Sequence, residues 1–366
     1  MERKACGPDE DDVRTLSSGG RDSIGPVTEA VLTTRALNRA LLARQLLLER
    51  VPLSIPDALS RLAGIQNQYA PNAYLRLWSC LKDFSRDDLT RAYEDASVIQ
   101  GTLMRGTIHS VARDDYRLFL GAIQRTQREW GARVTKAPPT LDRSAALARV
   151  RAAMAAGPIK RPALDDLLRD EHRAVRQSID TDLAILRVPP SGTWERRRAD
   201  LCALADDDIG PDGEVTEEIA LPEVIRRYLA AFGPASAGDV ASFLGMSVSP
   251  VKALLATLDV RRFRAEDGTE LLDVHDGLLP DPETPAPVRF LPTWDAILLV
   301  HARRTQVLPE AHRPLVFHVK MPPSYPTFLV DGQVAGTWRH EDGELRLSPF
   351  GRLRPDDRAA LEEEAH

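Results

Sequence analysis

The chain has 366 residues, of which 43% are hydrophobic and 28% are charged, a composition typical of soluble globular proteins. This length exceeds what a single hydrophobic core usually supports, so two to four modules are expected. The formal net charge of −6 excludes a uniformly basic nucleic-acid binder, although one basic face is compatible with it. Because no apolar run approaches the roughly 20 residues that cross a membrane, no membrane association is expected.

The N-terminal segment is charged and rich in glycine and serine, and it lacks the apolar core of a secretory signal. A cytoplasmic protein is therefore expected. Residues 1–27 are expected to be a disordered extension, because they contain too few apolar side chains to form a core.

Cysteine and histidine give no metal-binding pattern. The three cysteines and eight histidines are scattered, without the spacing of a disulfide framework or a zinc site. The chain also contains no phosphate-binding glycine loop and no GxSxG nucleophile motif. We therefore expect neither a metal nor a cofactor.

Arginine dominates the basic residues, since only six of the 48 are lysine. The planar guanidinium suits recognition of phosphates and base edges. GC-rich coding would produce the same excess, so composition alone leaves both explanations open.

The first module, predicted over residues 28–135, has the order of a winged helix. Thr33 or Thr34 can cap its first helix, and Pro56 suits an early position of the second. Helices are predicted over 34–50, from Ser54 onward and over 86–95, and strand character follows over 98–111. Three helices followed by a β-ribbon are typical of a winged helix.

Two more copies of this order follow along the chain. Residues 136–205 predict three helices and then a strand-turn-strand segment around Pro189-Pro190. Residues 216–276 give the clearest copy, with Asp267-Gly268 as the turn of the final hairpin. We therefore predict an α+β protein, mainly α with β wings, that contains three tandem winged-helix modules.

A small β-rich module is predicted at the C-terminus, over residues 288–366. The preceding segment 277–287 is rich in proline and aspartate and predicts a linker. Asp331-Gly332 is a strong two-residue hairpin turn. Strands are predicted at 315–319, 327–330, 334–338 and 344–347, and a final helix is predicted from Pro355.

Two glutamines one residue apart, Gln66 and Gln68, form the first candidate site. Neutral amides are poor acids and bases, so this pair suggests positioning of a water molecule or a base. On a helix the two side chains would point about 200° apart, whereas an extended backbone would place both on one face with Asn67 opposite. The alternative is that Gln66 continues an apolar stripe as a buried amide satisfied by backbone groups.

A second candidate site is the segment Leu103–His109. If it is a strand, Arg105, Thr107 and His109 share one face and could line a polar cleft or bind phosphate. The alternative is a solvated strand face. Two arginine clusters flank the predicted second and third wings, where they could meet a DNA backbone or simply face solvent: Arg196, Arg197 and Arg198, and Arg261, Arg262 and Arg264.

The chain contains the stretches GIQNQYAPNAYLRLWSCL, GTLMRGTIHSVARDDY and RVPPSGTWERR. They resemble the bacterial winged-helix DNA-binding family of AlkZ and YcaQ, and the resemblance covers roughly residues 32–338. WDAILLVHARR, at 294–304, is similar to the C-terminal motif WDNLLLSHADR of this family. Asp295, His301 and Arg304 match that motif, whereas Ala296, Ile297, Val300 and Arg303 depart from it.

The family fold consists of three tandem winged helices that form a concave DNA-binding body, with a β-rich C-terminal part. Its characterised members are DNA glycosylases that release bulky alkylated bases and unhook interstrand crosslinks. The catalytic motif of the AlkZ branch is Gln, an aliphatic residue and Gln. The resemblance therefore implies that Gln66 and Gln68 are the catalytic pair, with Asn67 in place of the aliphatic residue.

The expected substrate is double-stranded DNA containing bulky or cationic alkylated purines. Alkylation at N7 or N3 makes the purine cationic and weakens its glycosidic bond, so the leaving group needs no strong acid. The amide oxygens would place a water molecule and stabilise the cationic sugar. A monomer without an obligatory protein partner is expected. The residues expected to contact DNA are Arg105, His109, His301, Arg304 and the turn Asp331-Gly332, which would probe the minor groove.

Two non-enzymatic alternatives are a transcription regulator and a factor that confers resistance by sequestering damaged DNA. Regulators with one winged helix usually dimerise to match two-fold operators. Three unequal copies in one chain favour recognition of DNA shape by a monomer. The identity of the adduct, and the choice between self-resistance and general repair, stay open at the level of sequence.

Overall fold

The computed structural model describes residues 30–210, 215–299, 305–317 and 324–365. The expected N-terminal extension, His301 and Arg304 lie outside these residues.

The N-terminal part contains the expected helices and one more. Helix α1 ends at Arg44 rather than Arg50, because Leu46 adopts a positive φ of 57°. Pro71 lies in the first turn of the unpredicted helix α3, where its missing N–H costs nothing. The elements are α1 (Thr34–Arg44), α2 (Ile55–Arg61), β2 (Ile65–Gln66), α3 (Pro71–Trp78), α4 (Arg86–Glu94), β3 (Val98–Thr102) and β4 (Ile108–Ala112).

Side chains at the helix starts explain where these helices begin. The hydroxyls of Thr33 and Ser54 accept the backbone N–H groups of Ala36 and Asp57. Ser85 and Asp88 form a reciprocal capping box at the start of α4.

The middle of the chain repeats the order of helices followed by strands. The long helix α5 (Arg113–Thr135) leads into a group comprising α6 (Ser144–Met154), β5 (Ile159–Lys160), α7 (Arg161–Leu167), α8 (Arg173–Asp182), β6 (Ile185–Arg187), β7 (Leu201–Leu204) and α9 (Ala205–Ile209). The next group comprises α10 (Glu217–Phe232), α11 (Ala237–Leu244), α12 (Val248–Leu255), β8 (Arg261–Ala265) and β9 (Glu270–Asp273). The short strand β1 (Val31–Leu32) pairs in parallel with β8.

The first two groups share one six-stranded sheet, in the order β2-β4-β3-β6-β7-β5. Their junction is the pairing of β3 with β6, in which Gln100 lies opposite Arg187 and Gly101 opposite Leu186. The two hairpins are therefore parts of one hydrogen-bonded structure, and the catalytic motif predicted at Gln66 lies on its first strand.

The C-terminal part is a four-stranded sheet with flanking helices. Its elements are β10 (Arg289–Leu291), α13 (Ala296–Leu299), a 3₁₀ turn (Glu310–His312), α14 (Arg313–Val316), β11 (Thr327–Val330), β12 (Gln333–Glu341), β13 (Glu344–Pro349) and α15 (Pro355–Glu364). The strand expected at 315–319 is wrong for Leu315 and Val316, which lie in α14. Short apolar runs do not distinguish a strand from a buried helix, and Pro314 suits the first turn of a helix.

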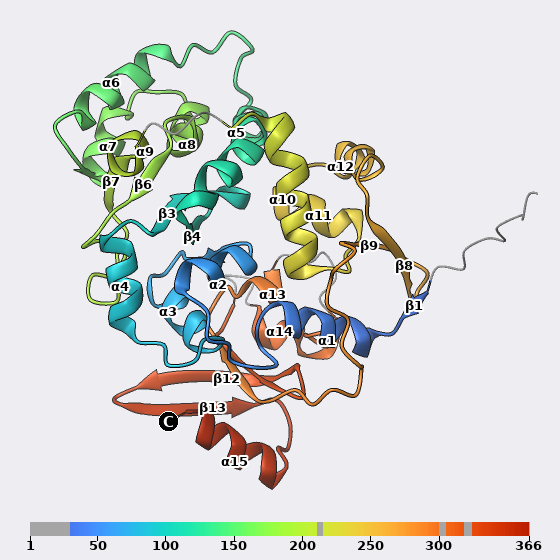
Figure 1. The fold of residues 1–366 in the computed structure, drawn as a ribbon. Coiled ribbons are helices and arrows are strands. Elements are labelled where there is room, and N and C mark those ends of the chain that lie inside the picture. Colours follow the sequence, from blue (N-terminus) through green and yellow to red (C-terminus); the bar gives the residue numbers. More distant parts are fainter. Residues whose placement is uncertain (1–29, 211–214, 300–304, 318–323, 366) are drawn as a thin grey trace, which may run out of the picture.

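Helices α5 and α10 pack against each other near the centre of the molecule. In Figure 1, helices α6–α9 lie at one end and the β12–β13 hairpin with α15 at the other. The rings of Tyr228, Phe232 and Phe243 cluster in the core, and Tyr228 lies 4.8 Å from Phe243 between centroids. No helix in the described part of the chain is long and apolar enough to span a membrane.

Candidate active site

The backbone turns from helix to strand just before the glutamine pair. Helix α2 ends at Arg61, and positive φ angles of 55° at Ala63 and 81° at Gly64 redirect the chain into β2. A side chain at Gly64 would also meet Val111, since a Cβ there would lie 2.8 Å from that residue. The helix therefore ends before Gln66, as cooperation between Gln66 and Gln68 requires.

The strand β4 holds the pair in place. Gln66 lies opposite His109, and the backbone N–H of Asn67 donates to the carbonyl of Ile108 at 2.7 Å. The side chain of Gln68 continues this ladder, because its Oε1 accepts the backbone N–H of Ile108 at 3.2 Å. Gln66 is buried and Gln68 is exposed.

Gln66 is oriented by a cation. Its Oε1 accepts a hydrogen bond of 2.7 Å from Arg105 Nη2. An arginine can only donate, so this contact fixes which end of the Gln66 amide faces Arg105. Among the described residues, each glutamine oxygen thus has one lone pair engaged and a second available to a water molecule, and neither amide NH₂ has a hydrogen-bond partner.

Arg105 occupies a tight turn, and the expected continuous strand face is wrong. Residues Met104–Gly106 form a 3₁₀ turn in which Arg105 has a positive φ of 58°. Burial lowers the pKa of Arg105 to about 10, so its guanidinium stays charged near neutral pH. Among the described residues no carboxylate forms an ion pair with it, and its other contacts are the carbonyl (3.5 Å) and ring of Phe243. A half-buried cation therefore lies beside Gln66 without a negative partner in the described part of the chain.

His109 is a neutral core residue. Its Nδ1 lies 2.9 Å from the carbonyl of Thr107, so Nδ1 carries the hydrogen. Burial, with a smaller contribution from the Arg105 cation, lowers the pKa of His109 to about 3. His109 was expected to contact DNA from a polar cleft, but its imidazole is buried and uncharged near neutral pH, so it does not act as a surface cation there.

The low pKa of His109 predicts a loss of stability in acid. The unfolded chain binds a proton below about pH 6.5, whereas the folded protein does not until about pH 3. The free energy of unfolding contributed by His109 is complete above pH 6.5 and should fall by about 1.4 kcal/mol per pH unit as the pH drops from there toward 3. Urea unfolding of the wild type and His109→Gln between pH 4 and 7 measures this slope. Equal slopes for the two proteins would contradict it.

Asn67 lies on the opposite face of the motif in a polar pocket. It is buried, and its amide lies 3.1 Å from the hydroxyl of Ser110. With its oxygen accepting from Ser110, its nitrogen donates to the carbonyls of Tyr69 (3.0 Å) and Ala70 (3.2 Å). These contacts hold the turn that follows the motif and give a physical reason for asparagine in place of an aliphatic residue.

The turn Asp331-Gly332 exists as expected, but it packs against α1. The Asp331 carboxylate forms ion pairs with Arg39 and, at 2.9 Å, with Arg35. The carbonyl of Gly332 accepts from Asn38 Nδ2 at 2.8 Å, and a Cβ at Gly332 would lie within 2.6 Å of Asn38 and Leu42. A turn held in this way is not available to probe a groove. The other Asp-Gly turn of the C-terminal sheet, at Asp342-Gly343 between β12 and β13, is exposed, and the same sequence signal would have found it.

Replacing Asp331 with alanine tests this structural role. The carboxylate is 52% exposed, which weakens each ion pair, but Arg39 is fully buried and would lose its partner. We expect Asp331→Ala to lower the free energy of unfolding by about 1–2 kcal/mol. Its binding to undamaged duplex should keep the salt dependence of the wild type. Unchanged stability together with weakened DNA binding would restore the groove-probing role.

A small cavity beside Gln66 connects the motif to the C-terminal part. It is lined by Gln66, Arg76, Trp294 and Asp295, among others. The Arg76 Nε lies 3.2 Å from Asp295 Oδ2, and burial raises the pKa of Asp295 while the Arg76 cation partly offsets this. Asp295, identified only through its motif, is therefore next to the candidate site.

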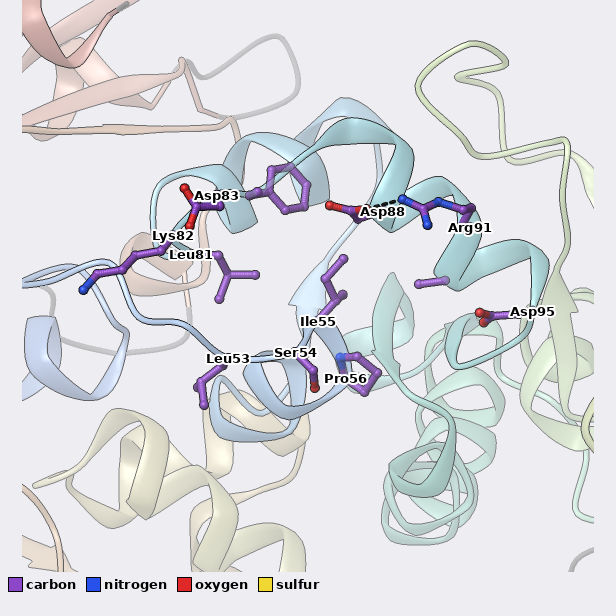
Figure 2. Close-up of a pocket in the computed structure, with 12 residues that line it drawn as sticks. Leu53, Ser54, Ile55, Pro56, Leu81, Lys82, Asp83, Asp88, Arg91 and Asp95 are labelled. Atoms are coloured by element: carbon purple, nitrogen blue, oxygen red, sulfur yellow. Dashed lines mark hydrogen bonds and ion pairs between the residues drawn. The ribbon is translucent and has the colours of Figure 1, made fainter.

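Other features of the described chain add no chemistry to this site. A shallow groove at the starts of α2 and α4 is lined by Pro56, Phe84 and Asp88, among others, and contains neither motif glutamine (Figure 2). No group of three His, Cys, Asp or Glu side chains in the described residues is placed to hold a metal ion.

Comparison with known proteins places the chain in a family. Residues 59–366 match the family described as DNA glycosylase AlkZ-like. The chain belongs to the AlkZ-like DNA glycosylase family. It is also similar to an interstrand DNA cross-link repair glycosylase of Streptomyces sahachiroi, with 25% identity over 358 residues that cover 88% of this chain and 92% of that protein.

The fold agrees with a solved member of the AlkZ-like family. The structure of the Streptomyces sahachiroi DNA glycosylase AlkZ aligns with a TM-score of 0.76 and 20% sequence identity. The alignment covers 92% of this chain and 95% of that one. The two proteins therefore share a mixed α and β fold over almost their whole length.

Proposed function

We propose that this protein is a monofunctional DNA glycosylase that hydrolyses the N-glycosidic bond of bulky or cationic alkylated purines and unhooks interstrand crosslinks. The observation that carries the proposal is that the side chains of Gln66 and Gln68 are both held by the segment Arg105–Ile108: Arg105 donates to the Gln66 amide oxygen at 2.7 Å, and the backbone N–H of Ile108 donates to that of Gln68 at 3.2 Å. Membership of the AlkZ-like family and the name of the Streptomyces relative support the reaction class.

The chemistry fits neutral amides. A cationic alkylpurine is already a good leaving group, so the site does not have to protonate it. The free lone pairs of Gln66 and Gln68 can hold the attacking water, and their partial negative charge can stabilise the cationic sugar. The neutral His109 also fits, because it adds no second cation beside the oxocarbenium-like centre.

Arg105 has a second role in this proposal. The Arg105 guanidinium has no carboxylate partner among the described residues, so it can donate hydrogen bonds to a DNA phosphate when substrate binds. The phosphate would offset the charge of Arg105 near the reacting sugar, and the same guanidinium would keep Gln66 oriented.

We also propose that residues 28–135, 136–205 and 216–276 are three winged helices that bind duplex DNA as a monomer. In each segment, helices precede a pair of antiparallel strands: β3 and β4, β6 and β7, and β8 and β9. Residues 288–366 would form a β-rich module, with the exposed Asp342-Gly343 turn as its groove-facing hairpin. His301 and Arg304 remain proposed DNA contacts.

Release of N7-alkylguanine from duplex DNA by the wild-type protein tests the function. We expect free base and an abasic product, and cleavage of N7-linked interstrand crosslinks into separable strands. No release across several adducts, together with a sequence-specific footprint, would indicate a transcription regulator. Tight binding to damaged DNA without release would indicate a sequestering factor.

A further inference from the structure

The loop that joins β6 to β7 carries a basic cluster that the proposed reaction does not use. Arg196, Arg197 and Arg198 are consecutive and exposed. With Lys160 they line a surface hollow of about 380 Å³, which also contains the carboxylates of Glu195 and Asp200. Four cations thus face two carboxylates, and the hollow has an excess of positive charge.

These arginines differ from those of the third hairpin. There, Arg261 pairs with Asp273 at 2.8 Å and Arg262 with Glu270 at 2.5 Å, so their charges are offset within the hairpin. In the β6–β7 loop, no carboxylate of the described residues forms an ion pair with Arg196. Arg198 is 86% exposed and reaches Asp200 only at 3.8 Å. Both guanidinium groups are thus available to an external anion.

The loop is held in shape by its own contacts. The guanidinium groups of Arg86 on α4 and of Arg197 lie 5.1 and 5.6 Å from the centroid of the Trp194 ring. The loop runs beside α4 (Figure 1). At its base, the Ser191 hydroxyl accepts the backbone N–H groups of Asp200 and Leu201 at 2.6 and 3.0 Å. The cations are therefore presented from an ordered loop, which limits the entropy lost on binding.

One contact joins this loop to the catalytic motif. Arg197 Nη1 donates to the Tyr69 hydroxyl at 2.8 Å, and its guanidinium lies 5.9 Å from the Tyr69 ring centroid. Tyr69 directly follows Gln68 and is 41% exposed. An anion bound at the loop would therefore lie on the same side of the molecule as the exposed end of the glutamine pair.

We propose that Arg196 and Arg198 bind backbone phosphates of the DNA strand beside the damaged nucleotide, with Arg197 and Tyr69 fixing the position of the loop relative to Gln68. This inference rests on the proposed function for the nature of the ligand. Phosphate contacts carry no sequence information, and they set the register of the protein on the duplex.

Salt-dependent binding of an undamaged duplex, followed by fluorescence anisotropy, tests this surface. Each phosphate contact contributes about 0.9 to the slope of log affinity against log salt, so Arg196→Ala/Arg198→Ala should lower the slope by about 1.8. The matched control Arg151→Ala/Arg173→Ala removes two exposed arginines from helices α6 and α8 and should leave the slope unchanged. The Arg196→Lys/Arg198→Lys variant keeps the charge and should keep most of the slope.

An unchanged slope in Arg196→Ala/Arg198→Ala, or an equal decrease in the control variant, would overturn the proposal. The measurement does not depend on catalysis, so it separates the two ideas. A protein that releases no base but shows the expected slopes has the phosphate-binding loop without the proposed reaction. A protein that releases base with unaltered slopes has the reaction without this loop as a contact.

Discussion

Replacing Gln66 with alanine is expected to slow the release of N7-alkylguanine by roughly 10²-fold to 10³-fold, the loss typical of removing one preorganised polar group from a reaction centre. Gln68→Ala should reduce the rate by a comparable factor. If the pair holds a single water molecule, the double variant should lose little more than either single variant, because groups that act together are not additive.

Single-turnover measurements with enzyme in excess isolate the chemical step from product release. Gln333→Ala, which removes an exposed glutamine at the start of β12, is the matched control and should react as the wild type does. Urea unfolding of each variant shows whether the fold is retained. Wild-type rates in both Gln66→Ala and Gln68→Ala would remove the pair from the reaction.

Replacing Arg105 with methionine should lower the rate of base release by about 10-fold to 100-fold without a loss of stability. The reaction slows because the Gln66 amide loses the donor that orients it and the substrate loses a phosphate contact. Stability is expected to stay level or rise, because the half-buried cation has no carboxylate partner among the described residues and its desolvation is unfavourable.

A slower reaction without a loss of stability distinguishes a positioning role of Arg105 from a structural one. Arg105→Lys keeps the charge but loses the planar fork, so it should bind duplex DNA nearly as the wild type does and still react slowly. A fall in unfolding free energy that matches the fall in activity would indicate that Arg105 only supports the fold.

Local sequence signals predicted most of the helices and hairpins correctly. Serine and threonine caps, prolines in first turns and Asp-Gly pairs act over a few residues, so the helix starts after Thr33, Ser54 and Ser85 and the turn at Asp331-Gly332 were found. Helix α2 also ends before Gln66, which is the condition that the spacing of the two glutamines set for their cooperation.

The surroundings of the candidate site could not be predicted from the sequence, because they depend on contacts between segments that are far apart in the chain. The alternating pattern predicted that Arg105 and His109 share one strand face, but a positive φ at Arg105 separates them, and burial makes His109 neutral. The packing of Asp331-Gly332 on α1 joins residues about 290 positions apart. No local pattern reports such a contact, so these roles required the three-dimensional structure.

The pairing of β3 with β6 has a consequence for how the protein can be divided. Because backbone hydrogen bonds cross the boundary between the first two groups of helices, a fragment that ends near residue 135 would expose β3 as an open sheet edge, with only β4 between it and the strand that carries Gln66. These two groups of helices and strands should unfold in one cooperative transition. Removing either group should disturb the positions of Gln66 and Gln68. The candidate site thus depends on the joined sheet, and we expect that neither group of helices and strands can be transplanted without the other.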